Sequence, residues 1–273
     1  MFSLLSSKTK MVDRADALPG RDRPIPTAPR HLIFDRPQAR NAMTWAMYQQ
    51  LAEACERLAS DATVRAVLLR GAGGQAFVAG TDIAQFADFR DGEDGIAYER
   101  QIDAGITQLA SLPMPTIALV EGWAVGGGLA IATACDFRLA TPGSKFGVPI
   151  ARTLGNGLSI ANIARLRAAW GHERVRRMLL LADMVGADEA LDCGYLHALV
   201  VPDALGDEGL ALAQRLAALA PVTQRVSKAA LQRLAVHELP EGEDLIRAVY
   251  GSDDFREGVR AFVEKRAPVW KGR

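Results

Sequence analysis

Short apolar segments, each followed within a few residues by glycine, alternate with helical patterns over the first half of this sequence. Residues 63–70 and 116–120 are mostly apolar and have the length of a buried strand. Apolar residues recur at helical spacing over about 43–60 and 94–111, and a small-residue helix is expected near 128–134. Beyond about residue 148, helical segments dominate. The pattern predicts an α/β core followed by a helical C-terminal part. Further strands are expected at 31–35, 136–140 and 197–201.

The charge balance narrows the class of protein. Lys and Arg number 32 and Asp and Glu number 32, so the formal net charge is zero. Non-specific binding to nucleic acid requires an excess of cations that neutralise phosphates, so we expect no nucleic-acid partner. No apolar run reaches the roughly 18 residues that a membrane-spanning helix needs, so we expect no membrane partner.

Cysteine and histidine usage points to a chain that folds without cross-links. Cys55, Cys135 and Cys193 are far apart and odd in number, and we expect reduced thiols and a cytoplasmic location. The four histidines never fall at the spacings that hold a metal on one helix face, so no metal site is expected.

Two glycine-containing turns stand out as places where backbone could meet a ligand. Residues 76–83 read AFVAGTDI and residues 121–130 read EGWAVGGGLA, and each combines a strand end with small residues and a following helix. Backbone N–H groups in such turns are not used by a sheet, and the lack of bulky side chains lets a ligand approach. Two converging N–H groups would stabilise an oxyanion. Tight packing of a helix on a strand is the alternative, and the spacing leaves both open.

Two other motifs are weaker. Residues 71–76 match the dinucleotide-binding pattern G-x-G-x-x-[GA], but residues 77–80 do not open a helix, so we interpret the glycines as a turn. Ser159 lies in a segment that lacks the last glycine of a nucleophile elbow, and we predict that it caps a helix. We also expect Asn41 to cap the helix predicted from about residue 43.

Five motifs in order resemble the crotonase (enoyl-CoA hydratase/isomerase) superfamily over about residues 35–271. They are RPQARNA at 36–42, AFVAGTDI at 76–83, GWAVGGG with CDFRLAT at 122–141, FGVP at 146–149, and DFREG with FVEKR at 254–266. The resemblance implies a spiral of ββα units and a helical C-terminal region that drives trimerisation, as a homotrimer or a homohexamer. We therefore expect a core over 31–200 and a helical region over 201–273. The prolines and mixed charges of residues 1–30 predict a disordered or loosely packed tail.

The resemblance also implies a site. The two backbone N–H groups of the family's oxyanion hole fall on Thr81 and Gly127, the middle of three glycines. Contacts with coenzyme A, which is part of the thioester substrate and not a separate cofactor, fall on Arg40, Ala79, Ile83, Phe262 and Lys265. Of these, Phe262 and Lys265 are expected to reach the coenzyme A of a neighbouring subunit.

The sequence departs from the family at both positions where hydratases carry a glutamate. Here those positions are Ala130 and Ile150, and neither side chain can exchange protons. Asp82, which follows Thr81, and Arg152, which lies just beyond Ile150, are the polar residues near these motifs that are considered in place of the glutamates. Asp82 either takes part in the chemistry or caps a helix, and Arg152 either binds a substrate carboxylate or lies at the surface or between subunits.

Three aromatic residues complete the set of candidates. Tyr98 and Tyr195 are possible acids, and Trp123 is expected to pack in the core.

We therefore expect an acyl-CoA enzyme of the enoyl-CoA hydratase/isomerase family, a lyase or isomerase that stabilises an enolate or oxyanion in an atypical reaction. A catalytically silent acyl-CoA-binding protein, and a decarboxylase or C–C hydrolase on the same fold, are the alternatives.

Overall fold

The computed structural model describes residues 10–15 and 29–273, and its larger sheet has six strands. In spatial order these are β1 (Lys10–Ala15), β2 (Arg30–Asp35), β3 (Val67–Gly71), β5 (Thr116–Val120), β7 (Phe137–Ala140) and β10 (Ala198–Leu199). Strand β1 is antiparallel to β2, and the other neighbours are parallel. Within the segment expected to be a loose tail, β1 is instead paired in the sheet, and residues 1–9 and 16–28 lie outside the described residues.

A second sheet of four strands completes a repeated unit. It contains β4 (Ala76–Val78), β6 (Trp123–Val125), β8 (Lys145–Gly147) and β9 (Met184–Gly186), in that order, with β9 antiparallel to β8. Three times, a strand of the large sheet is followed by a strand of the small sheet and then by a helix. These helices are α2 (Gly92–Ala110), α3 (Gly127–Ala134) and the short α4 (Ile150–Thr153). The predicted spiral of ββα units is confirmed.

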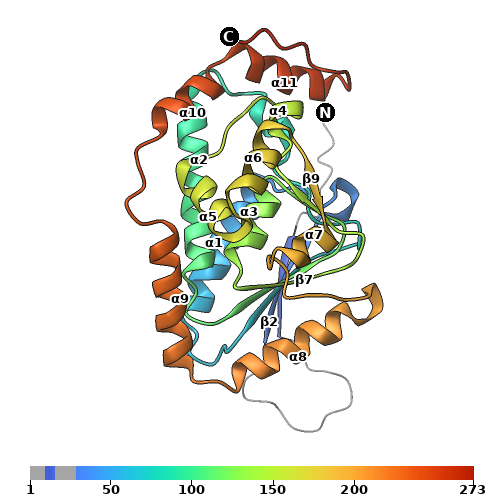
Figure 1. Cartoon of the computed structure of the whole chain (residues 1–273), viewed down its shortest axis with the longest axis vertical. Coiled ribbons are helices and arrows are strands. Elements are labelled where there is room, and N and C mark those ends of the chain that lie inside the picture. Colours follow the sequence, from blue (N-terminus) through green and yellow to red (C-terminus); the bar gives the residue numbers. More distant parts are fainter. Residues whose placement is uncertain (1–9, 16–28) are drawn as a thin grey trace, which may run out of the picture.

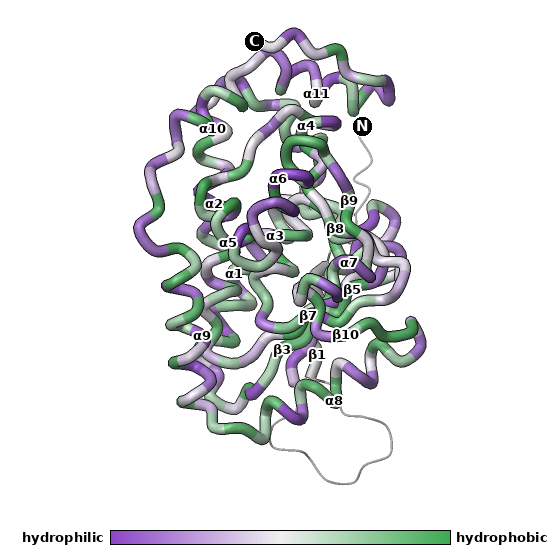
Figure 2. Tube along the Cα trace, viewed as in Figure 1, coloured by the Kyte–Doolittle hydropathy of each residue, from purple (hydrophilic) through white to green (hydrophobic). Residues whose placement is uncertain are grey.

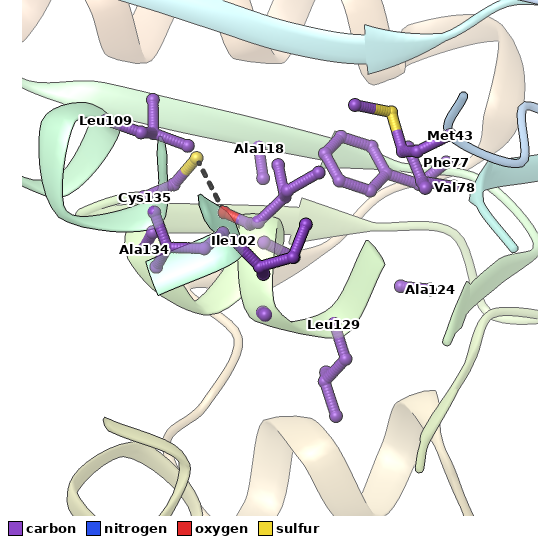
Figure 3. Close-up of a cluster of buried hydrophobic side chains, with 14 of the residues drawn as sticks. Met43, Phe77, Val78, Ile102, Leu109, Ala118, Ala124, Leu129, Ala134 and Cys135 are labelled. Atoms are coloured by element: carbon purple, nitrogen blue, oxygen red, sulfur yellow. Dashed lines mark hydrogen bonds between the residues drawn. The ribbon is translucent and has the colours of Figure 1, made fainter. Parts of the chain in front are cut away.

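Alternate side chains of the large sheet face two different cores, because successive residues of a strand point to opposite faces. One face packs against α1 (Trp45–Ser60), α2 and α3, and Figure 3 shows part of this cluster around Phe77, Ala118 and Leu129. The other face packs against α8 (Leu205–Ala217), which crosses the lower end of the molecule in Figure 1. The continuous apolar character of the central strands follows from this double burial.

Helices form most of the chain after residue 159. They are α5 (Ile160–Trp170), α6 (His172–Leu180), α7 (Ala187–Asp192), α8, α9 (Pro221–Ala235), α10 (Glu243–Tyr250) and α11 (Asp253–Val263). Short 3-10 helices lie at η1 (Pro37–Ala39), η2 (Ile83–Phe86) and η3 (Pro202–Ala204). Helix α10 packs along α2, and α11 packs on η2. No helix of the described ranges is long and apolar enough to cross a membrane.

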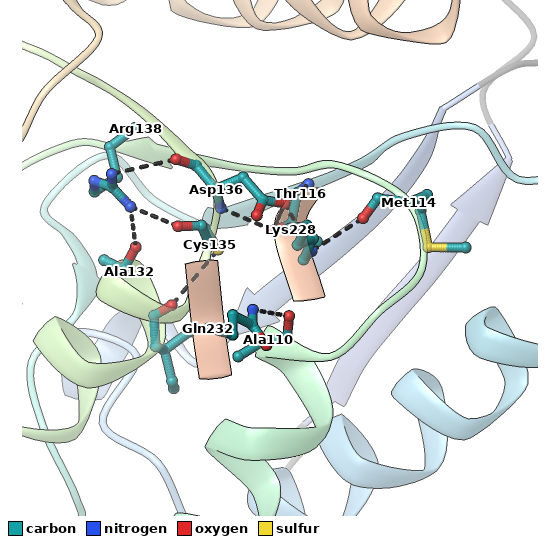
Figure 4. Close-up of polar contacts among 10 residues, drawn as sticks. Ala110, Met114, Thr116, Ala132, Cys135, Asp136, Arg138, Lys228 and Gln232 are labelled. Carbon is teal, nitrogen blue, oxygen red and sulfur yellow. Dashed lines mark hydrogen bonds and ion pairs between the residues drawn. The ribbon is translucent and has the colours of Figure 1, made fainter. Parts of the chain in front are cut away.

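Helix α9 lies at the edge of the molecule, and none of its residues is fully buried (Figure 1). Polar and apolar residues alternate along it in Figure 2, and its larger apolar side chains are exposed. Its main polar anchor is Lys228, shown in Figure 4, which donates to Asp136 at 2.7 Å and to the Met114 carbonyl at 3.1 Å. Asp136 also accepts from the Thr116 N–H at 2.8 Å, so this ion pair ties α9 to the sheet.

Several local predictions are settled by these elements. The Ser159 hydroxyl accepts from the Asn162 N–H at 3.1 Å, which confirms it as the cap of α5. Residue 76 opens strand β4 and not a helix, so the turn interpretation of residues 71–76 is also confirmed.

Two local predictions were wrong. Thr44, not Asn41, caps α1, since its hydroxyl accepts from the Met47 N–H at 3.3 Å. Trp123 is 40% exposed and not in the core. Strand β6 has only three residues and turns Ala124, the residue after Trp123, toward the interior.

Candidate active site

The two glycine-containing turns meet at Thr81 and Gly127. Thr81 follows β4 and pairs with Met43 in an isolated parallel bridge, in which the Asp82 N–H donates to the Met43 carbonyl at 2.8 Å. Gly127 is the first residue of α3. A methyl group on the Gly127 Cα would lie 3.5 Å from the Thr81 Oγ1. The fold thus brings together the two residues that the resemblance assigned to the oxyanion hole.

Neither backbone N–H of this pair has an acceptor within the described part of the chain. The first N–H groups of a helix have no partner inside it, and the first turn of α3 is closed by the Ala130 N–H on the Gly126 carbonyl at 3.1 Å. Gly126 enters the helix with φ 53° and ψ −118°, a conformation that L side chains rarely adopt. This turn therefore leaves the Gly127 N–H free at the start of α3, where the helix dipole favours negative charge.

The triple glycine also serves the alternative role that its sequence left open. A Cβ on Gly128 would lie 2.0 Å from the Val78 carbonyl oxygen, so the third glycine is required for α3 to pack on β4. The two interpretations are thus compatible, because the packing depends on Gly128 whereas the expected donor is Gly127.

Three hydroxyl groups from three elements meet beside these donors. The Tyr48 hydroxyl of α1 lies 2.8 Å from the Thr81 Oγ1, and the Tyr98 hydroxyl of α2 lies 2.9 Å from the same atom. A Cβ on Gly127 would lie 2.5 Å from the Tyr48 hydroxyl, so this phenol lies directly against the glycine. Burial raises the pKa of Tyr48 to about 12 and that of Tyr98 well above 10, so both hydroxyls hold their protons at neutral pH.

Aromatic rings fix the position of Tyr98. Its ring meets those of Trp45 and Phe86 edge to face, with centroids 5.3 Å and 5.1 Å away. Phe86 also contacts Phe255 of α11, with centroids 6.0 Å apart. Helix α11 therefore supports the Phe86 ring on which Tyr98 packs.

A buried carboxyl group joins α2 to α10 and to the start of α5. One oxygen of Glu99 accepts from the Tyr250 hydroxyl at 2.9 Å, and the other accepts from the Ser159 N–H at 2.9 Å. The Tyr250 hydroxyl accepts in turn from the Asn156 Nδ2 at 3.2 Å. Burial outweighs these hydrogen bonds and raises the pKa of Glu99 from 4.5 to about 7.

Sequence reasoning missed both Tyr48 and Glu99. Tyr48 occupies an apolar position of the amphipathic helix α1, and Glu99 stands before the exposed Arg100, so neither shows a distinctive local pattern. Only the helical period of α1 indicates that Tyr48 faces the interior.

The two substitutes for the lost glutamates occupy different surroundings. The Asp82 carboxylate accepts from the Ala84 N–H at 3.2 Å as the cap of η2 and pairs with Arg36 at 2.7 Å. Arg152 is exposed on α4. At the glutamate positions themselves, Ala130 is buried in α3 and Ile150 packs against the core.

The residues expected to contact coenzyme A fall into two groups. One group lies near the end of β4, and the other is exposed at the C-terminal end of α11. The Arg40 carbonyl accepts from the Ala79 N–H at 3.1 Å, so these two residues are neighbours, and Ile83 is the first residue of η2 and packs against the core. Phe262 is 55% exposed near the end of α11, and Lys265 is exposed just beyond it.

Tyr195, the other proposed acid, is stacked on Trp170 with centroids 3.7 Å apart and shares a hydrogen bond of 3.1 Å with Thr133. Arg138 lies over the Tyr195 ring and donates to the Tyr195 carbonyl at 2.8 Å (Figure 4 shows other contacts of this arginine). These contacts hold the ring within the packed interior.

A spiral of ββα units with free N–H donors where two units meet defines a crotonase-fold protein, and comparison with known proteins agrees. The sequence profile of the enoyl-CoA hydratase/isomerase family matches residues 30–273. A probable enoyl-CoA hydratase of Rhizobium meliloti is 33% identical over 89% of this chain and 94% of its own.

Solved structures extend the likeness. An enoyl-CoA hydratase/carnithine racemase from Magnetospirillum magneticum has a TM-score of 0.72 and 34% identity over 89% of this chain and 92% of its own. A methylmalonyl-CoA decarboxylase in complex with 2-nitronate-propionyl-CoA has a TM-score of 0.80 and 28% identity over 89% of this chain and 95% of its own. The chain belongs to the enoyl-CoA hydratase/isomerase (crotonase) family, a family of acyl-CoA enzymes.

Proposed function

We propose that this protein acts on an acyl-CoA thioester and holds the thioester carbonyl oxygen with the N–H groups of Thr81 and Gly127. The observation that carries this proposal is that Thr81 and Gly127 are adjacent in the fold, with a Cβ on Gly127 reaching to 3.5 Å from the Thr81 Oγ1, while neither backbone N–H has an acceptor in the described chain. Backbone donors need no reorganisation when negative charge develops on the oxygen. Each such donor is worth about 3 to 4 kcal/mol of transition-state stabilisation.

The reaction that fits this site best is the decarboxylation of a 2-carboxyacyl-CoA. Hydration and double-bond isomerisation need a group that accepts a proton, and Ala130 and Ile150 supply none. Decarboxylation needs no base. The bond between the α-carbon and the carboxylate breaks, its electron pair forms the thioester enolate, and CO₂ leaves. The likeness to a methylmalonyl-CoA decarboxylase supports this choice.

We further propose that Arg40, Ala79 and Ile83 contact the coenzyme A of their own chain, and that Phe262 and Lys265 reach that of a neighbouring copy in a trimer or a dimer of trimers. Exposed apolar side chains support such an assembly, since surfaces of this kind usually mark interfaces. They include Leu180, Leu181, Val226, Leu231 and Leu234. Three free cysteines fit the cytoplasmic location that we propose.

Incubation with malonyl-CoA, methylmalonyl-CoA and crotonyl-CoA tests the proposed reaction. We expect CO₂ release from at least one carboxylated thioester and very slow hydration of crotonyl-CoA. Hydration at the speed of a typical family hydratase would overturn the assignment. Tight binding of all three thioesters without turnover would instead indicate the catalytically silent alternative.

A further inference from the structure

The three hydroxyls beside the oxyanion hole form one continuous hydrogen-bonded chain. Thr81 stands in the middle, with Tyr48 at 2.8 Å and Tyr98 at 2.9 Å from the same oxygen. A hydroxyl group both donates and accepts, so Thr81 is able to accept from one phenol while donating to the other. The three residues come from α1, the turn after β4, and α2, and so this chain depends on the tertiary fold.

This hydrogen-bonded chain of hydroxyl groups lies at the point where the thioester is proposed to bind. Thr81 supplies one N–H of the hole from its backbone and the central hydroxyl from its side chain. The Tyr48 hydroxyl lies against Gly127, the source of the other N–H, where a Cβ would approach it to 2.5 Å. Tyr48 is 7% exposed and Tyr98 is 9% exposed, so both phenols are buried while each keeps a small area of contact with solvent.

The chemistry that follows decarboxylation calls for such donors. Loss of CO₂ leaves an enolate whose α-carbon must receive a proton. An acid that stays protonated until the carbanion forms suits this step, and a buried phenol is such an acid. At the two positions that usually carry the family's glutamates, this protein has Ala130 and Ile150, and neither can donate a proton.

We propose that Tyr48 is the catalytic acid that protonates the α-carbon of the enolate, with Thr81 and Tyr98 resupplying its proton. The O–H bond of Tyr48 breaks, a C–H bond forms at the α-carbon, and the enolate returns to a thioester carbonyl. Thr81 then passes its proton to Tyr48, Tyr98 passes its own to Thr81, and water reprotonates Tyr98. One solvent proton is consumed for each CO₂ released. This inference rests on the proposed decarboxylation.

The test uses methylmalonyl-CoA in D₂O with the full-length protein and the variants Tyr48→Phe, Thr81→Val and Tyr98→Phe. Thr81→Val removes the central hydroxyl but keeps the backbone N–H of the hole. Tyr250→Phe is the matched control, because it removes a buried phenol hydroxyl that bonds Glu99 and Asn156 and not Thr81. The measurements are kcat, KM and the configuration of the deuterium at C2 of the propionyl-CoA product.

We expect the wild-type protein and Tyr250→Phe to place deuterium in a single configuration. Tyr48→Phe should lower kcat by roughly 100-fold or more with KM nearly unchanged, and its product should carry deuterium in both configurations. Thr81→Val and Tyr98→Phe should lower kcat by a smaller factor than Tyr48→Phe does. These two variants test the proposed relay of hydroxyl groups even if Tyr48→Phe does not fold.

The outcomes separate the two proposals. If the wild-type protein releases no CO₂ from any carboxylated thioester, the proposed function and the role of Tyr48 both fall. If it decarboxylates and the three variants keep its rate and its stereospecificity, only the role of the hydroxyl chain falls, and the three hydroxyls serve to join α1 and α2.

Discussion

The replacement Glu99→Gln should remove a pH dependence from the stability of this protein. Glu99 is 4% exposed, and its two oxygens accept from Tyr250 and Ser159. Burial raises the pKa of this carboxyl group from 4.5 to about 7, so the folded protein holds the proton more tightly than the unfolded chain does. Glutamine keeps the size of the side chain and an acceptor oxygen but does not titrate.

The sign and size of the effect follow from linkage. The stabilisation by the proton is complete below about pH 4.5 and is lost as the pH rises through about 7. Each pKa unit corresponds to about 1.4 kcal/mol, so the full loss is about 3 kcal/mol. Most of this loss falls between about pH 5 and pH 8, where we expect the wild-type free energy of unfolding to fall by about 2 to 3 kcal/mol relative to Glu99→Gln.

Urea unfolding followed by circular dichroism at several pH values measures this difference. Protein concentration must be the same throughout, because association changes the apparent stability. Equal m values would show that the two proteins expose the same surface on unfolding. Glu53→Gln, on the exposed face of α1, controls for the loss of one negative charge. Parallel pH profiles for the wild-type protein and Glu99→Gln would refute the reasoning.

Three further predictions test the surroundings of the site. Gly127→Ala places a methyl group 2.5 Å from the Tyr48 hydroxyl, so its cost in unfolding free energy should shrink by about 1 kcal/mol in a Tyr48→Phe background; additive costs in a double-mutant cycle would contradict this contact. Asn41→Ala removes a buried side chain that donates to the carbonyls of residues 72 and 76 at 2.9 Å and 2.8 Å, and should lower the unfolding free energy by about 3 kcal/mol, measured by urea unfolding. A loss under about 1 kcal/mol would mean that water replaces these bonds. Lys265→Ala should weaken acetyl-CoA binding in calorimetry by about 1 kcal/mol at low salt and less at high salt, whereas unchanged binding would exclude this lysine from the coenzyme A site.

Local pattern was sufficient for the central strands of the large sheet and for the longer helices, but not for the short strands of the small sheet. The strand predicted at 116–120 is β5 with the same bounds, and the helix expected at 94–111 is α2, Gly92–Ala110. Burial on both faces of a strand, or on one face of a helix, repeats over a few residues and so is visible in the sequence. The order of strands and helices indicated an α/β core, whereas the spiral was implied by the resemblance to the crotonase superfamily. The same resemblance pointed to Thr81 and Gly127 before their proximity was seen.

The groups around those donors were decided only by the tertiary structure. Tyr48 bonds Thr81 across 33 residues of sequence, and Tyr250 bonds Glu99 across 151. The prediction that Asn41 caps α1 was wrong for a related reason. The Asn41 side chain donates to carbonyls 31 and 35 residues away, and the Thr44 hydroxyl caps the helix instead. Such bonds depend on which side chains the packing of α1, α2 and α10 brings within 3 Å. A sequence pattern reports which face of each helix is buried but not which polar group it will meet there, because that partner belongs to another element.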